Sequence, residues 1–169
     1  MELTPRRRKI ALIAHVASSV GWLGADAVLV VLGVAGLTGA AGGPDAVYPV
    51  AGLIGTVLIT PLALAALLTG LLIGLGTKWG LLRYWWVAVK LGVTAVMNVL
   101  VLFVLAPGLR EAARLGADLP RDDAINYVVA PSVACALLLF TTVLSVAKPW
   151  TRTARGRRAV RARRVPSTA

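Results

Sequence analysis

The chain has only one cysteine and one histidine, Cys135 and His15, among its 169 residues. A single cysteine excludes an internal disulfide and any zinc or iron–sulfur site that needs several cysteines. Acidic residues are also scarce, with 7 Asp and Glu against 18 Lys and Arg. The sequence contains no Walker A loop, HExxH motif, paired catalytic carboxylates or Ser/His/Asp set. Any chemistry must therefore use the interior of the fold or a bound cofactor.

Charged residues make up only 15% of the chain, whereas 58% of the residues are hydrophobic. Soluble domains carry about 25% charged residues, so this chain is too apolar for an ordinary soluble surface. Four apolar stretches reach the length of about 20 residues that a helix needs to cross a hydrocarbon core. They cover residues 10–37, 50–76, 84–106 and 127–147. We expect an all-α, antiparallel four-helix transmembrane bundle over residues 1–150, followed by a basic tail, 151–169.

The basic residues are unevenly distributed along the chain. Of the 18, 14 lie in the N-terminus, in the loop between the second and third stretches, and after the fourth stretch, where Lys148 precedes the seven Arg of the tail. The positive-inside rule then predicts that both termini are cytoplasmic. We expect a multi-pass protein of the bacterial inner membrane. We expect the tail to be disordered and to lie on anionic lipid, in preference to binding nucleic acid. A cleaved signal peptide is disfavoured because the first stretch is longer than the roughly 7–15 apolar residues of such signals.

Two ionisable residues inside the apolar stretches, His15 and Lys90, indicate a candidate site. An ionisable side chain in hydrocarbon costs about 2.5–3.5 kcal/mol, so its presence there is by default a sign of function. His15 follows Lys9 by six residues and Lys90 follows Tyr84 by six, which is about 9 Å of helix in both cases. The two side chains are therefore predicted at similar depth, and they would meet if the first and third helices were neighbours. Snorkelling of Lys90 and a hydrogen-bonded neutral His15 are the simpler alternatives.

Two further polar residues, Asp26 and Asn98, are predicted to be buried. Asp26 shares one helical face with His15, Trp22 and Gly33, and this face should pack against protein. Asp26 lies about 16 Å from His15 along the helix axis, so the two cannot pair directly. A protonated Asp26 that is hydrogen-bonded to a neighbouring helix is the simplest interpretation, and a proton or cation relay is the alternative. Asn98 lies at the edge of the face that carries Lys90.

Two segments resemble a bacterial superfamily that includes the copper-resistance protein D membrane domain and the HemJ-type protoporphyrinogen oxidases. They are KIALIAHVASSVGWLGAD, residues 9–26, and WVAVKL, residues 86–91, which look like the first and third helices of that superfamily. The whole-chain pattern, including the closing SVAKPWTRT, most resembles a family of small bacterial predicted integral membrane proteins of unknown function with four transmembrane helices. The resemblance implies that His15 and Lys90 hold haem b. Because His15 is the only histidine, ligation by two histidines of one chain is excluded.

For function, we expect a non-enzymatic accessory or partner-binding role in the membrane, as a homo-oligomer or with a membrane partner. The first alternative is a haem- or porphyrin-binding redox protein that uses His15 and Lys90. The second is transport of a small molecule or ion, such as a proton or copper, through the bundle. One histidine, one cysteine and the internal Met97 are a thin supply of ligands for copper, and the sequence predicts no protein metal site.

Overall fold

The computed structural model describes residues 3–76 and 84–147. Four described helices are each long and apolar enough to cross a membrane: Pro5–Thr38, Pro44–Leu75, Trp85–Asp118 and Arg121–Ala147. No strand occurs among the described residues, so the all-α class and the four apolar helices are confirmed. The loop residues Lys78 and Arg83 and the basic tail, 151–169, lie outside the described residues. Contact of the tail with anionic lipid therefore stays a prediction.

The first span is one continuous helix, α1 (Pro5–Thr38). At its start the Thr4 hydroxyl accepts a hydrogen bond from the Arg7 backbone N–H at 3.4 Å, which caps one of the free donors of the first turn. Pro5 stands in the first turn, where its fixed φ suits a helix and its missing N–H costs nothing. The helix ends at Gly39, whose φ of 76° is the left-handed conformation of a helix C-terminus.

The second and third spans each contain a π-helical segment that ends shortly before a proline. The second span is α2 (Pro44–Leu53), the π-helix η1 (Ile54–Ile59) and α3 (Thr60–Leu75). The third is α4 (Trp85–Leu100), the π-helix η2 (Val101–Leu105), α5 (Ala106–Leu115) and the 3-10 turn η3 (Gly116–Asp118). Pro61 and Pro107 follow the two π-segments. Because proline lacks an N–H and its ring clashes with the carbonyl four residues earlier, a widened turn accommodates it without breaking the helix.

The helices extend beyond the apolar stretches found in the sequence. The second span begins at Pro44 instead of residue 50, and the third continues to residue 118 instead of ending at 106. The fourth, α6 (Arg121–Ala147), begins six residues before the predicted start at 127. Hydropathy marks only the apolar part of each helix, whereas helix ends are stabilised by charge. In the first turn of α6, Asp122 and Asp123 interact favourably with the helix dipole.

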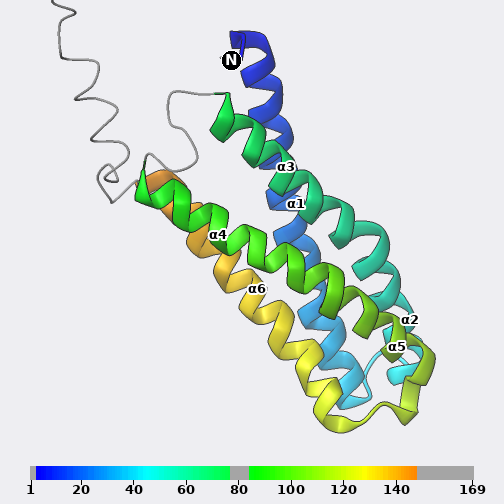
Figure 1. Cartoon of the computed structure of the whole chain (residues 1–169). Coiled ribbons are helices and arrows are strands. Elements are labelled where there is room, and N and C mark those ends of the chain that lie inside the picture. The colour runs from blue at the N-terminus through cyan, green and yellow to red at the C-terminus, as the bar shows by residue number, and fades with distance from the viewer. Residues whose placement is uncertain (1–2, 77–83, 148–169) are drawn as a thin grey trace, which may run out of the picture.

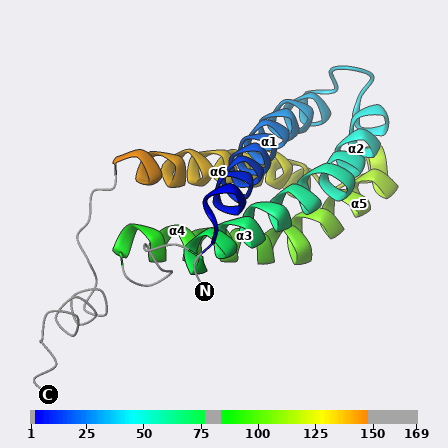
Figure 2. The same cartoon turned by 90° about the horizontal axis from the view of Figure 1, so that it is seen from above.

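The first and third spans share their neighbours. α1 packs against both α3 and α6, and α4 packs against the same two helices, an arrangement seen from above in Figure 2. The buried core draws on all four spans and includes Trp22, Leu29, Ile59, Ala63, Met97 and Leu138. The first and third spans therefore lie on opposite sides of the bundle, with α3 and α6 between them.

At one end of the molecule α2 and α5 lie side by side (Figure 1), and this end is closed by contacts at glycines. A Cβ on Gly33 would lie 2.5 Å from the Tyr127 carbonyl oxygen, and one on Gly36 would lie 2.8 Å from the Tyr48 ring. The two tyrosine rings pack together, with centroids 6.2 Å apart and ring planes at 59°. We call this the glycine-packed end. The residues that define it are Gly33, Gly36, Gly52, Gly55 and Gly108 with Tyr48, Leu109 and Tyr127.

Candidate functional site: a pocket shared by His15 and Lys90

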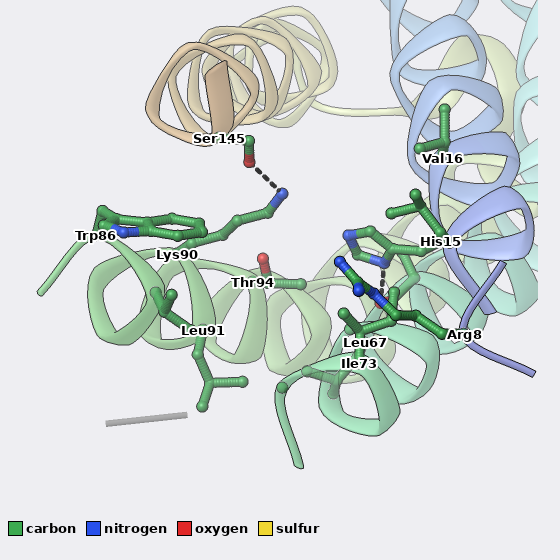
Figure 3. A pocket seen from close by; sticks show the side chains of 15 residues that line it. Arg8, His15, Val16, Leu67, Ile73, Trp86, Lys90, Leu91, Thr94 and Ser145 are labelled. Atoms are coloured by element: carbon green, nitrogen blue, oxygen red, sulfur yellow. Dashed lines mark hydrogen bonds between the residues drawn. The ribbon is translucent and has the colours of Figure 1, made fainter. Parts of the chain in front are cut away.

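His15 and Lys90 line the same pocket, which lies away from the glycine-packed end and is drawn in Figure 3. Its volume is about 310 Å³, and α1, α3, α4 and α6 all contribute to its wall. Besides these two residues, Arg8, Thr94 and Ser145 line it with polar side chains, and most of the remaining wall is apolar. We call it the His15–Lys90 pocket. The structure thus brings together the two residues for which the sequence predicts a common depth.

The hydrogen bonds of His15 determine which ring nitrogen faces the pocket. Nδ1 lies 2.9 Å from the Ala66 carbonyl oxygen and 3.1 Å from the Thr69 hydroxyl of α3. Because a carbonyl oxygen can only accept, Nδ1 carries the proton of a neutral ring and Nε2 keeps its lone pair. Figure 3 shows the second ring nitrogen on the side of the pocket that faces Lys90. Close packing of the ring on α3 depends on Gly70, where a Cβ would lie 3.1 Å from His15 Cε1.

Lys90 reaches across the pocket to the fourth span. Its Nζ donates to Ser145 Oγ at 2.7 Å, and Ser145 Oγ in turn donates to the Thr141 carbonyl oxygen at 2.9 Å. This chain leaves the hydroxyl lone pairs of Ser145 free to accept from the ammonium. The Lys90 stem lies along the pocket wall, with its head directed towards the side that carries His15 (Figure 3). An ammonium carries three N–H groups, and among the described residues Lys90 donates one of them to Ser145.

The charge of the His15–Lys90 pocket is one-sided. Arg8 and Lys90 are cationic, His15 is a nitrogen base, and none of the described lining residues is Asp or Glu. A cleft with walls of low dielectric and charge of one sign focuses its field on a ligand of the opposite sign. The apolar side chains of the wall, such as Leu67 and Ile73, can contact a hydrocarbon or ring body. The chemistry that suits this pocket is an amphiphile with an anionic group.

Asp26 and Asn98 lie elsewhere. Asp26 is 0% exposed and Asn98 is 2% exposed, and neither lines the His15–Lys90 pocket. Both are in the core between the spans, so the polar residues that the sequence singles out fall into two separate groups.

A second pocket of about 500 Å³ lies between the third span and α6. Its wall is mainly apolar, with Asp123, Asn126 and Tyr127 as its polar residues. Met97 lines this second pocket and not the first, so it is not placed to share a ligand with His15.

No group of three or more His, Cys, Asp or Glu side chains that could hold a metal ion occurs within residues 3–76 and 84–147. Cys135 makes a long contact, with its Sγ donating to the Leu23 carbonyl oxygen at 3.9 Å, and it lies outside the His15–Lys90 pocket.

Three contributors to the pocket were not singled out from the sequence. Arg8 belongs to the basic N-terminus, Ser145 lies in the fourth apolar stretch, and the Ala66 carbonyl oxygen that holds His15 belongs to an apolar residue. The sequence does indicate Ser145 as a possible partner of Lys90, because its hydroxyl group lies near the end of the fourth apolar stretch, on the same predicted side of the membrane as Lys90. A backbone carbonyl has no such signal. Comparison with protein families, curated proteins and solved structures gives no match for this chain.

Proposed function

We propose that this chain is a multi-pass protein of the bacterial inner membrane that binds an anionic amphiphile in the His15–Lys90 pocket. Its role is that of a non-enzymatic accessory or partner-binding protein. The observation that carries the proposal is the convergence of Arg8, His15 and Lys90 on one apolar-walled pocket whose described lining contains no acid. Such intramembrane cations are costly unless a partner uses them.

The proposed orientation is an antiparallel bundle with both termini in the cytoplasm. Two contacts support opposite directions for α1 and α6, because Leu23 meets Cys135 whereas Gly33, further along α1, meets the earlier Tyr127. The excess of basic residues at the termini supports the cytoplasmic side. The His15–Lys90 pocket then opens near the cytoplasmic leaflet, where anionic lipids are concentrated.

An anionic phospholipid has the chemistry that this position and charge favour. Its phosphate oxygens accept charge-assisted hydrogen bonds from Lys90 and Arg8, and its acyl chain contacts the apolar wall. Basic pockets between transmembrane helices on the cytoplasmic side are known to hold anionic headgroups.

Native mass spectrometry of the detergent-solubilised protein tests this proposal, with phosphatidylglycerol against zwitterionic phosphatidylcholine. We expect retention of phosphatidylglycerol by the wild type and a loss of tenfold or more in Lys90→Met, because a hydrogen bond to a charged group contributes about 1.5–3 kcal/mol. Lys9→Met is the matched control, since Lys9 is exposed on α1 and does not line the pocket. Equal retention of both lipids, or equal losses in the two variants, would contradict the proposal.

Haem b is a second candidate ligand, supported by the hydrogen bond of His15. A histidine that ligates a metal commonly donates its other ring N–H to a backbone carbonyl, as Nδ1 does here to Ala66. His15 Nε2 would hold the iron, and Arg8 and Lys90 suit the carboxylates of a porphyrin. The bound cofactor would supply redox chemistry. Since Met97 lines the other pocket, His15 and Lys90 are the residues that would hold the cofactor.

The absorbance spectrum of the purified protein separates the two candidates. Haem binding predicts a haem spectrum, as isolated or after haem titration, that is lost in His15→Ala. A preparation that stays colourless through the titration would eliminate haem and leave the lipid proposal standing.

Cysteine accessibility in cells tests the orientation. In a Cys135→Ala background, Ala40→Cys stands in the exposed turn between α1 and α2. We expect it to react with a membrane-impermeant maleimide added from the periplasmic side. Labelling of this position only from the cytoplasm would overturn the orientation.

A further inference from the structure

A buried carboxyl group in the core, Asp26, has unsatisfied hydrogen-bonding capacity. Asp26 is 0% exposed, and neither carboxyl oxygen has a hydrogen-bond partner among the described residues. One helical turn earlier, Trp22 is also 0% exposed, and its Nε1 has no partner within the described part of the chain. Both side chains stand on the buried face of α1. Burial of an ionised carboxylate without a partner is among the costliest events in a protein interior.

Asn98 of α4 brings a third unsatisfied atom to the same core. Its Nδ2 donates to the Thr94 carbonyl oxygen at 2.9 Å, but its Oδ1 has no partner among the described residues. The bond between Lys90 and Ser145 shows which parts of α4 and α6 lie at the same level along the bundle axis. Asn98 lies eight residues after Lys90 on α4. With α4 and α6 in opposite directions, Asn98 is about level with Leu137.

The position of Asp26 along the bundle axis can be compared with the same helix, α6. Asp26 follows Leu23 by three residues, and the Leu23 carbonyl oxygen contacts Cys135. Asp26 is therefore about level with Ser132 of α6. Along the bundle axis, this places Asp26 about 8 Å from Asn98. Both side chains are buried, and their chain neighbours Ala25 and Met97 belong to the same cluster of buried core residues.

Within residues 3–76 and 84–147, no cation stands beside Asp26 to neutralise it. α3 and η1 carry no titratable side chain, and α6 contributes the Cys135 thiol near Asp26. The only basic residue of α4 is Lys90, which is bonded to Ser145 at the pocket. On α1 itself, His15 lies eleven residues away, about 16 Å along the axis.

In the described part of the chain, neutral donors are all that an ionised Asp26 would have beside it. They are Trp22 N–H and the second Nδ2–H of Asn98, against two carboxylate oxygens and the Asn98 carbonyl oxygen. One added proton removes the buried charge and gives the site a third donor, the Asp26 O–H, for which the Asn98 carbonyl oxygen is an acceptor. A bridging water molecule adds two donors and two acceptors.

We propose that Asp26, with Trp22 and Asn98, forms a proton-binding site in the core of the bundle, in which the carboxyl group is neutral and is linked to Asn98 through buried water. The site is separate from the His15–Lys90 pocket and does not depend on the ligand bound there. It holds one exchangeable proton at the depth at which a fixed negative charge would be most costly.

Infrared spectroscopy of the full chain in detergent at neutral pH tests the proposal. We expect a protonated carboxyl C=O stretching band in the wild type that shifts in D₂O and disappears in Asp26→Asn. Asp122→Asn, which removes an exposed acid in the first turn of α6, should keep the band. A wild-type spectrum with only carboxylate bands, with or without sodium, would overturn the proposal.

A second variant keeps the test independent of the folding of Asp26→Asn. Asn98→Leu removes the proposed acceptor and leaves the carboxyl group, so the C=O band should persist at a shifted frequency. A band at the unchanged frequency in Asn98→Leu would show that Asn98 is no part of the site. Loss of the band in Asn98→Leu would contradict protonation caused by burial.

Discussion

The two ends of the bundle are built in opposite ways. At the glycine-packed end, Gly33 and Gly36 allow α1 to meet Tyr127 and Tyr48 with no space for a Cβ. At the other end, α3 contributes Gly70 to the wall of the His15–Lys90 pocket, and polar side chains from α1, α4 and α6 surround a volume of about 310 Å³. Close packing maximises dispersion contacts and gives one well-defined arrangement. The open pocket lacks part of those dispersion contacts.

This difference indicates that the two ends have different roles, one in stability and the other in binding. The glycine-packed end fixes how the spans are joined, since α2, α5 and the start of α6 meet there and Asp45 Oδ1 accepts from the Ala117 backbone N–H at 2.8 Å. The pocket end can then hold basic side chains apart without loss of the fold. Substitutions at the glycine-packed end should change the stability of the fold, whereas substitutions at the His15–Lys90 pocket should change ligand binding.

The largest effect on stability is expected for Gly33→Ala. The added Cβ would meet the Tyr127 backbone carbonyl oxygen at 2.5 Å, and backbone cannot move aside as a flexible side chain can. Overpacking of this kind costs about 1–3 kcal/mol, which exceeds the gain of about 0.5–1 kcal/mol in helix propensity from replacing glycine. Thermal unfolding in detergent should show a lower midpoint than the wild type.

Gly24→Ala is the matched control for this prediction. Gly24 lies in the same helix, and a Cβ there would have nothing within 4 Å among the described residues. We expect its midpoint to be unchanged or slightly higher. If Gly33→Ala were as stable as Gly24→Ala, the glycine-packed end would not be closed as described.

A smaller effect is expected for Gly70→Ala at the pocket. The new Cβ would press on His15 Cε1 at 3.1 Å and weaken the bond from Nδ1 to Ala66, which is worth about 1 kcal/mol. Because His15 is the only histidine, its ring ¹⁵N resonances report on this site alone. They should indicate an Nδ1–H tautomer in the wild type and change in Gly70→Ala. Gly92→Ala, with open space at its Cβ, should leave them unchanged.

The smallest effect is expected for Ser145→Ala. The variant removes the acceptor of Lys90 but frees an N–H of the ammonium for the ligand. The loss and the gain are each on the order of 1 kcal/mol, so affinity for phosphatidylglycerol should change by less than about fivefold. A loss as large as that in Lys90→Met would show that Ser145 contacts the ligand itself.

The sequence predicted the spans well and the site only in outline. Apolar length and the positions of charge are properties of each stretch alone, so four helices could be found without knowledge of their packing. The common depth of His15 and Lys90 came from counting residues from the helix ends. Their partners, the Ala66 carbonyl and Ser145, depend on which spans are neighbours, and the first and third turned out to share α3 and α6. The π-segments before Pro61 and Pro107 were also not predicted, because a proline can equally kink or end a helix.

Thermal unfolding of Gly33→Ala and Lys90→Met, each with and without phosphatidylglycerol, tests the division between the two ends most directly. A ligand that binds the folded state raises its unfolding midpoint. We predict that Gly33→Ala has a lower midpoint but keeps the rise caused by the lipid, and that Lys90→Met keeps a wild-type midpoint but loses the rise. A rise in Lys90→Met equal to that of the wild type would contradict the proposed binding site.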